Sequence, residues 1–335
     1  MAYAARIVLD SISQANIRLT TMEVRFPRYV LPEFNTHRVF SRNSASSRAI
    51  PVKKQLRNLL SDPYVPDKFG RNQRGMQSYS FLAGLKHDEA TRIWLRARDR
   101  NATSAFELLL GERLSGDIFG YNPECGHANI KRLEAGFDDA IFYAGNAANN
   151  EQLETTDILD VHKQFANRVL ETFMWQTVIV TATEWSNFFA LRANPAAQPE
   201  IRIIAEMMQA LYRENEPTYV APGEWHLPFI QPDEIRWAHE NIESAKKVSA
   251  ARSARVSYLT HDGKRDMSED LALYERLVTP GHMSPLEHPA TPCPHACCDG
   301  SSRSSSSQGQ WHGNFRGWKQ LRKFIPNEHD FSLVR

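Results

Sequence analysis

The first apolar pattern along the chain is an alternation over residues 17–26, IRLTTMEVRF. Ile17 and Leu19 share one phase of this alternation, and the apolar residues after them share the other phase. Alternation of this kind predicts a strand, and the change of phase predicts a bulge or a twist within it. Pro27 follows where its fixed φ angle suits a first helical turn, and helix-like spacing continues over residues 28–40.

Helical spacing governs much of the remaining chain. Apolar residues recur every four positions in residues 156–192, so the pattern predicts one long helix there. After a break, Pro199 opens a second predicted helix, on which Ile203, Met207 and Leu211 share a face. Further helices are predicted at residues 88–113 and 266–278.

Several stretches have the composition of loops. Serine and asparagine side chains compete with the backbone for hydrogen bonds, and proline removes a backbone donor, so both disfavour regular structure. The last of these stretches, SSRSSSSQGQ, is expected to be flexible. The predicted irregular segments are residues 41–48, 62–77, 214–233 and 301–310.

Composition narrows the class of protein. The chain has 335 residues, with 40 Lys and Arg, 39 Asp and Glu and a formal net charge of +1. This balance argues against non-specific nucleic-acid binding, which usually depends on a basic excess. No apolar run approaches the roughly 20 residues that span a bilayer, and no signal peptide is evident. Because four cysteines are too few for a disulfide framework, a cytoplasmic protein without membrane or nucleic-acid partners is expected.

The first candidate site combines Thr-His-Arg at residues 36–38 with Ser-Ser-Arg at residues 46–48. Guanidinium groups, hydroxyls and free backbone N–H groups together suit a phosphate. A solvated basic loop is the alternative, and composition alone favours it.

A second candidate site lies in residues 181–200. Asn187 and Arg192 are five residues apart, and Arg192 closes the predicted helix, where a cation also offsets the helix dipole. The three aromatic residues between positions 185 and 189 favour a core or interface role over stacking on a cofactor.

The third candidate site is GHMSPLEH, residues 281–288, which contains two histidines six residues apart and a glutamate. This spacing does not match zinc patterns such as HExxH. Downstream, CPHACC at residues 293–298 lacks regular CxxC pairs, so free thiols are favoured and no metal site is predicted. The chain contains neither a glycine-rich phosphate loop nor a GxSxG nucleophile elbow.

Taken together, these clusters resemble the signatures of the flavin-dependent thymidylate synthases, the ThyX class. The family signature is Arg-His-Arg, seven residues and then Ser, usually followed by x-Arg. Residues 36–38 and 46–48 match all of it except the first Arg, and the lead-in LTTMEVRFPRYVLPEFN matches the family's strand–Pro–helix segment. NFFALRANPAAQPEI, residues 187–201, resembles the second family signature.

The order of the motifs is unusual for this family. ARVSY (254–258) and GHMSPLEH (281–288) resemble a signature that precedes Arg-His-Arg in the family but follows it here. The resemblance therefore implies a circular permutation, which proteins tolerate when their termini lie close together. The implied fold class is α+β, with a ThyX-like central β-sheet and long helices. The implied domains are a catalytic core at residues 1–50 and 151–295, a mainly helical insert at 51–150, and a C-terminal extension with a Ser-rich loop at 296–335.

The resemblance also implies a chemistry. The family transfers one carbon from methylenetetrahydrofolate to C5 of dUMP, giving dTMP, and uses FAD that NADPH reduces. No cysteine nucleophile is needed, which agrees with the lack of cysteine in the three matching clusters. Its members are homotetramers with active sites between subunits, and a permuted relative is expected to be of phage type.

Residue roles carry over by position. Arg192 resembles the Arg that holds the pyrimidine edge and favours an N3-deprotonated ring, because a fixed cation stabilises an anion in a dry site. The implied catalytic residues are Arg192 and Ser46. The implied substrate-binding residues are Glu33, Ser47, Arg48, Arg168 and Arg192. The implied cofactor-binding residues are Thr36, His37, Arg38, Thr183, Asn187, Ser257, His282, Ser284 and Glu287.

A few positions depart from the family pattern. Thr36 and Thr183 replace family arginines, Glu33 replaces a glutamine, and Ser44 replaces a glutamate. Basic and amide residues from the insert (Arg71, Gln73 and Arg74) or from residues 314–323 are candidates to compensate for the missing residues.

These departures keep other functions open. A pyrimidine hydroxymethylase would use the same folate carbon but quench it with water, giving 5-hydroxymethyl-dUMP or 5-hydroxymethyl-dCMP. A non-catalytic nucleotide or nucleic-acid binder would use the Arg-rich loop alone. A metal-dependent hydrolase built on His282, His288 and the cysteine cluster is the least favoured alternative.

Overall fold

The computed structural model describes residues 3–75, 78–111, 121–122, 127–128, 159, 161–258, 265–294, 311–326 and 328. The chain divides into two compact units. The first unit contains Pro27–Tyr29 and Ser46–Trp175, and the second contains Ala2–Phe26, Val30–Ala45 and Gln176–Arg335.

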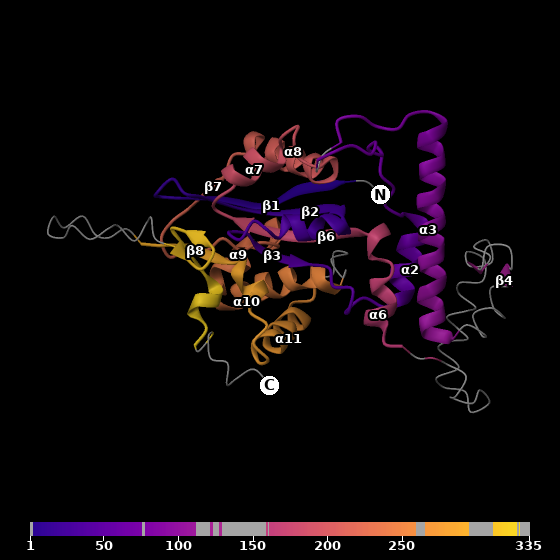
Figure 1. The fold of residues 1–335 in the computed structure, drawn as a ribbon. Coiled ribbons are helices and arrows are strands. Elements are labelled where there is room, and N and C mark those ends of the chain that lie inside the picture. Colours follow the sequence, from indigo (N-terminus) through magenta and orange to yellow (C-terminus); the bar gives the residue numbers. More distant parts are fainter. Residues whose placement is uncertain are drawn as a thin grey trace, which may run out of the picture. The chain divides into compact units, whose positions relative to one another are not determined.

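Helices form most of the described part of the first unit (Figure 1). The long helix is α3 (Leu85–Leu110), which confirms the helix predicted at residues 88–113. It is accompanied by α2 (Val52–Ser61), α6 (Lys163–Arg168) and a 3₁₀ turn at Glu171–Phe173. Strands β4 (Tyr121–Asn122) and β5 (His127–Ala128) form a short antiparallel pair.

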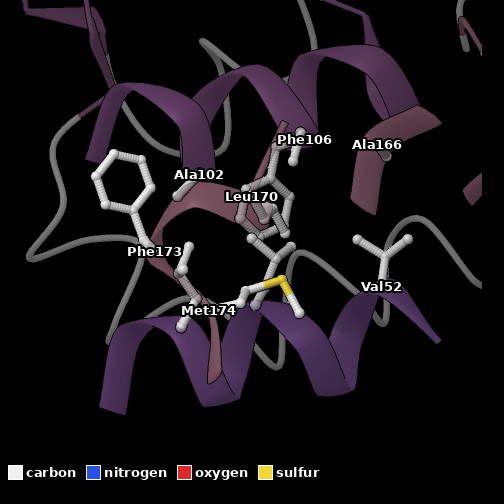
Figure 2. Packing of buried hydrophobic residues seen from close by; sticks show 10 residues of the cluster. Val52, Ala102, Phe106, Ala166, Leu170, Phe173 and Met174 are labelled. Atoms are coloured by element: carbon white, nitrogen blue, oxygen red, sulfur yellow. The ribbon is translucent and has the colours of Figure 1, made fainter. Parts of the chain in front are cut away.

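A single apolar cluster holds these helices together. Figure 2 shows Phe106 on α3 and Val52 on α2 pointing into the space between the two helices, where Leu170 also lies. Phe106 is 2% exposed and Leu170 is fully buried. Truncating such a buried phenylalanine to alanine costs about 3–5 kcal/mol, so this cluster makes a large contribution to the unit's stability.

The second unit is built on a five-stranded sheet with the order β3-β6-β2-β1-β7. Strands β1 and β2 are antiparallel, β3 and β6 are antiparallel, and β1 and β7 are parallel, so the sheet is mixed. The strands are β1 (Ala4–Ser13), β2 (Arg18–Pro27), β3 (Ser41–Ser44), β6 (Trp175–Ala182) and β7 (Thr218–Val220). The central mixed sheet and its helices confirm the coarse form of the predicted fold, a central β-sheet combined with helices.

Strand β2 confirms the strand predicted at residues 17–26. The predicted irregularity is also present, but the extra residue belongs to the partner strand. Ile7 pairs with Met22 and Leu9 with Thr21, so Val8 of β1 is the additional residue. Both phases of β2 are buried at this place, which explains why apolar residues occur in each.

The long helix predicted at residues 156–192 is wrong. Among the described residues of this range, α6, the 3₁₀ turn at Glu171–Phe173 and the later α7 (Ser186–Arg192) are helical, and β6 separates the first two from α7. Within β6, the run from Thr177 to Thr181 is entirely β-branched, which favours an extended backbone, and most of the strand is buried. The apolar residues spaced by four, from Val161 to Phe173, all precede β6, so the spacing covers only α6 and the turns beside it and does not continue through the strand.

The loop predicted at residues 41–48 is only partly correct. Ser41–Ser44 form β3, whose backbone pairs with β6 from Val178 to Thr181, so the serines do not need to bond their own backbone. Ser41 is buried, and its hydroxyl accepts hydrogen bonds from Asn314 (3.2 Å) and Gln320 (2.9 Å).

Helices lie on both sides of this sheet (Figure 1). On one side are α7 and α8 (Pro199–Glu214), and on the other are α9 (Ile235–Glu240), α10 (Ile242–Ala254) and α11 (Met267–Val278). A short helix, α1 (Leu31–Phe34), follows β2. The remaining 3₁₀ turns are Arg28–Val30, Pro232–Glu234, Arg255–Tyr258, Ser284–Glu287 and Leu321–Phe324.

Helices α8 and α11 confirm the predictions at Pro199 and at residues 266–278, but the buried face of α8 is displaced. The predicted face of Ile203, Met207 and Leu211 is only partly buried. Ile201, Ile204, Ala205 and Met208 are the residues that α8 buries.

The C-terminal segment packs into the core of the second unit. Its strands are β8 (Ala290–Pro292), β9 (Trp311–His312), β10 (Phe315–Arg316) and β11 (Trp318–Gln320). Phe315 and Trp318 are fully buried against Ile17 and Leu19, and the Trp318 indole donates to the Ile17 carbonyl (3.0 Å).

Some predictions lie outside the described residues. These are the flexible loop at 301–310 and the thiols of Cys125, Cys297 and Cys298, whereas Cys293 is a free, half-buried thiol. Of the helices that the structure describes, none combines the length and the apolar character needed to cross a membrane.

Candidate active site

Arg192 is the centre of a polar cluster in the second unit. Its Nε donates to Nε2 of His37 (3.1 Å), one terminal nitrogen forms an ion pair with the Glu33 carboxylate, and the other donates to Oγ1 of Thr36 (3.5 Å). Glu33, Thr36 and His37 come from α1 and the turn after it, and Arg192 closes α7. Four residues that the sequence predicted separately are thus brought together.

The hydrogen bond from Arg192 fixes the state of His37. Because Arg192 can only donate, Nε2 of His37 must be the acceptor and the imidazole must be neutral. Burial, followed by the charges of Arg192 and Arg42, lowers the pKa of His37 from 6.5 to about 4. His37 therefore stays neutral at physiological pH and accepts the hydrogen bond from Arg192.

Aromatic packing holds this cluster in place. The His37 ring stacks on Phe40, with centroids 5.6 Å apart, and meets the edge of Phe188 at 4.9 Å. Phe188 and Trp185 are buried, and Phe188 also contacts Phe40. The aromatic residues of α7 are core, as the sequence favoured, and this core orients Arg192.

Arg42 connects this cluster to the GHMSPLEH segment. It donates to the carbonyls of Phe34 (3.3 Å) and His37 (3.4 Å). Burial lowers the pKa of Arg42, and the negative charge of Glu287 opposes that shift. Glu287 is therefore close enough to Arg42 for the two charges to interact. Two motifs about 250 residues apart in the sequence are therefore neighbours in the second unit.

Asn43 makes a second connection to the same segment. The amide orientation that satisfies its neighbours lets Nδ2 donate to the carbonyls of Ser284 (3.3 Å) and Arg42 (3.0 Å) and to Nε2 of His288 (3.3 Å). The turn at Ser284–Glu287 is thereby fixed to β3. His282 and Ser284 project from this turn as exposed residues, and Glu287 pairs with Arg322 (2.7 Å).

Behind the turn, a chain of buried polar side chains crosses the sheet. The links are His288 Nδ1 to Thr181 Oγ1 (2.8 Å), Thr181 to Thr21 (2.7 Å), Thr21 to His226 Nε2 (2.8 Å) and His226 Nδ1 to Ser11 Oγ (2.7 Å). Ser11, Thr21, Thr181 and Asn43 stand on the adjacent strands β1, β2, β6 and β3. We call this chain, from Asn43 to Ser11, the sheet ladder.

The direction of the sheet ladder follows from Asn43. Because Nδ2 of Asn43 donates to Nε2 of His288, His288 carries its proton on Nδ1 and donates to Thr181. The hydroxyls then donate onward, and His226 donates from Nδ1 to Ser11. Burial lowers the pKa of both histidines to about 3, and the charge of His288 contributes to the shift of His226. The ladder is thus uncharged and fully bonded along its length.

The ARVSY segment lies on the same unit. Its 3₁₀ turn, Arg255–Tyr258, packs against β3 and contains the backbone of Ser257. Arg255 donates to the buried Asp270 (2.8 Å), which also accepts from Arg252 (2.9 Å). Arg252 in turn pairs with Glu234 (2.5 Å), so these charges are compensated inside the unit.

Thr183 and Asn187 have different surroundings. The Thr183 hydroxyl accepts from the backbone N–H of Arg316 (3.1 Å), whose side chain pairs with Glu184 (2.6 Å). The C-terminal segment 314–323, expected to compensate for departures, therefore reaches the position that lacks the family arginine. Asn187 is exposed on the first turn of α7.

Arg38 is exposed in the second unit, and the remaining predicted substrate-binding residues belong to the first unit. Nδ2 of the buried Asn167 donates to the carbonyls of Ser47 (2.6 Å) and Ile50 (2.9 Å), which binds the turn after β3 to α6. Ser46 and Ser47 lie in this turn, where Ser47 is buried. Arg48 and Arg168 are exposed, and within the described residues neither has an ion pair.

The sequence did not single out three residues that the structure makes important. Asn43, Asn167 and His226 are all buried and hold segments together through their side chains. No local signal marked them, because the segments that they hold together are more than 100 residues apart in sequence. In the described part of the chain, no group of three His, Cys, Asp or Glu residues is arranged to hold a metal ion.

Comparison with known proteins assigns the family. The model of the thymidylate synthase complementing protein family matches residues 13–218, and the chain belongs to this family. Among curated proteins, no relative matches the chain. The match includes the segments of the Arg192 cluster and ends before ARVSY and GHMSPLEH.

Two solved structures of a UMP/dUMP methylase, PolB from Streptomyces cacaoi, are also similar to the chain. The structure bound with 5-Br UMP is 16% identical, with a TM-score of 0.39, and the match covers 64% of this chain and 89% of that chain. The structure bound with 5-Br dUMP is 17% identical, with a TM-score of 0.35, and the match covers 59% and 66% of the two chains.

Proposed function

We propose that this protein is a flavin-dependent thymidylate synthase that transfers one carbon from methylenetetrahydrofolate to C5 of dUMP. The observation that carries the proposal is the Arg192 cluster. Residues of the two family signatures, Glu33, Thr36 and His37 on one side and Arg192 on the other, meet in hydrogen-bond contact. The family membership of the chain supports the same reaction.

The chemistry of the exposed residues fits FAD. Arg38, Asn187, His282 and Ser284 offer a cation, an amide, an imidazole and a hydroxyl, and none of these side chains is bonded within the described residues. All four belong to the second unit, with the remaining proposed flavin contacts, Thr36, His37, Thr183, Ser257 and Glu287. When bound and reduced by NADPH, FAD would supply the electrons that convert the transferred carbon into a methyl group.

Nucleotide binding is assigned to two sets of residues. Arg48 and Arg168 are exposed cations without ion pairs in the described chain, which suits a phosphate, and Ser46 and Ser47 lie beside Arg48 in sequence. Arg192 orients the pyrimidine, since His37 and the aromatic core fix its guanidinium.

The motif order supports a circular permutation. ARVSY and GHMSPLEH follow the matched region in sequence, yet both pack on β3, next to the Arg192 cluster. We therefore retain a catalytic core made of residues 1–50 and 151–295. A homotetramer with active sites between subunits, a phage-type origin and a cytoplasmic location complete the proposal.

One observation favours a hydroxymethylase as the second candidate. Thr183 bonds the backbone of Arg316 and offers no cation, and Thr36 bonds Arg192, so two family arginines are replaced by engaged hydroxyls. If these replacements change how the flavin delivers its electrons, water rather than hydride would complete the reaction at the transferred carbon.

One incubation separates these candidates. The FAD-loaded protein is mixed with dUMP, methylenetetrahydrofolate and NADPH, and the nucleotide product is weighed by mass spectrometry. A product with the mass of dTMP supports the synthase, and a product heavier by one oxygen replaces it with the hydroxymethylase. A protein that binds no flavin and converts no nucleotide would leave only a nucleotide-binding role.

A further inference from the structure

The groups bonded to Arg192 indicate which protonation state of the substrate this residue can bind. Each nitrogen of its guanidinium already donates one hydrogen bond: Nε to His37, one terminal nitrogen to Glu33 and the other to Thr36. Each terminal nitrogen carries a second N–H, which can still donate to a ligand. The side chains of Arg192 and Glu33 are only 21% and 27% exposed, so their charges compensate each other out of full contact with solvent.

A cation compensated in this way does not favour an anionic ligand. The expectation from the family was that Arg192 stabilises a pyrimidine ring that has lost its N3 proton. Here a carboxylate lies against the same guanidinium, and an N3 anion would face the Glu33 charge at short range. Like charges at such distances destabilise binding, whereas a neutral N–H does not meet this penalty.

We propose that Glu33 and Arg192 together bind the neutral form of the pyrimidine, with N3–H donating to Glu33 and an adjacent carbonyl accepting from Arg192. A carboxylate beside a guanidinium presents an acceptor next to a donor, and the N–H and C=O of a neutral uracil edge are its complement. Glu33 is thus a specificity-determining residue for the protonation state. This inference rests on the proposed function.

Around the Glu33–Arg192 pair, the group expected to titrate near neutral pH is N3 of the bound pyrimidine. His37 is neutral, with its pKa lowered to about 4, and Arg42 stays charged. Glu287 acts on the site through its charge, which opposes the pKa shift of Arg42. Helix α8 packs on α7, and its Tyr212, whose pKa is raised by burial, contacts Phe189.

The test compares dUMP with 5-fluoro-dUMP, whose N3 proton is more acidic because fluorine withdraws electrons. Both are titrated into the FAD-loaded protein from about pH 6 to about pH 9, and the ratio of their affinities cancels effects of the shared phosphate. In the wild type, the relative affinity of 5-fluoro-dUMP should fall as its N3 ionises, by up to about tenfold per pH unit. The ¹⁹F chemical shift of the bound ligand should match the neutral ring.

Glu33→Gln removes the carboxylate charge and keeps an amide of similar shape. In this variant the affinity ratio should stay level or rise with pH, and the ¹⁹F shift should move toward the ionised ring. Glu23→Gln is the matched control, because Glu23 pairs with Arg6 (2.7 Å) on the same sheet, and it should behave as the wild type.

The outcomes separate this inference from the proposed function. A wild-type ratio that is constant or rises with pH overturns the inference while leaving nucleotide binding intact. A Glu33→Gln variant that keeps the wild-type pH dependence also overturns it. If neither nucleotide binds the wild type at any pH, the proposed function fails, and the inference fails with it.

Discussion

Arginine has two opposite uses in this chain, and each unit supplies examples of one of them. In the first unit, Arg48 and Arg168 are exposed and without ion pairs in the described residues. In the second unit, each guanidinium nitrogen of Arg192 donates a hydrogen bond within the protein, and Arg252 is buried between Glu234 and Asp270. An unbonded cation is available to an anionic ligand, whereas a bonded one fixes the geometry of its neighbours. Arginine content alone therefore does not show where a phosphate binds.

The largest expected effect comes from breaking a buried ion pair of the second unit. Asp270→Asn should lower the free energy of unfolding by about 3–5 kcal/mol, because it leaves Arg252 and Arg255 buried with less compensation. Chemical denaturation measures the change. Asp233→Asn is the control, since its pair with Arg265 is largely exposed and should contribute no more than about 1 kcal/mol. Equal losses in both variants would contradict the distinction between buried and exposed pairs.

Next in size is the loss of the bonded arginine in the candidate active site. Arg192→Ala should lower kcat by about 10²–10³-fold, as removal of a fixed charge-stabilising donor usually does. The fold should persist, because aromatic packing rather than Arg192 forms the core of α7. Steady-state formation of dTMP and circular dichroism report the two effects. Near-normal turnover in a folded variant would remove Arg192 from the site.

Acid should lower the stability of the folded protein, because it protonates the two histidines of the sheet ladder. His226 and His288 have pKa values of about 3 in the folded protein, below the ordinary 6.5, so the unfolded chain binds more protons. Stability is therefore full above about pH 6.5 and is lost as the pH falls toward 3, by about 1.4 kcal/mol per pH unit for each histidine. Denaturation at a series of pH values gives the slope.

A pair of variants assigns that slope. His226→Gln should reduce the loss of stability with acid, because one buried titrating group is removed. His239→Gln should leave the slope unchanged, since His239 is exposed on α9. The same slope in both variants would show that the ladder histidines do not cause the acid sensitivity.

The smallest expected effects concern the unbonded arginines. Arg48→Ala and Arg168→Ala should each weaken dUMP binding about tenfold, the range of a charge-assisted hydrogen bond, and should not change the melting temperature. Calorimetry with dUMP and with deoxyuridine separates phosphate from base. If either variant loses affinity for both ligands equally, that arginine does not bind the phosphate.

The sequence predicted the parts of the fold whose pattern reflects local burial. Strand β2 and helices α3, α8 and α11 were predicted because the spacing of their apolar residues follows the period of a strand or of a helix. Strand β6 was missed because it is buried on both faces and has no alternation to show. For a strand in the middle of a sheet, the run of β-branched residues is the better signal.

The candidate site was predictable only through family signatures. Glu33, Thr36, His37 and Arg192 were each marked by position, but their mutual contacts depend on the fold. Glu33 was known as a departure from the family, and only its contact with Arg192 shows what that departure does.

The burial of Trp318 has a consequence for synthesis of the chain. This residue completes the apolar cluster that includes Ile17 and Leu19, and its indole bonds the Ile17 carbonyl. During translation, the N-terminal strands leave the ribosome about 300 residues before this partner is made. Until then, part of their apolar surface has no native cover, so a nascent chain of this protein is exposed to aggregation and is a natural client for chaperones.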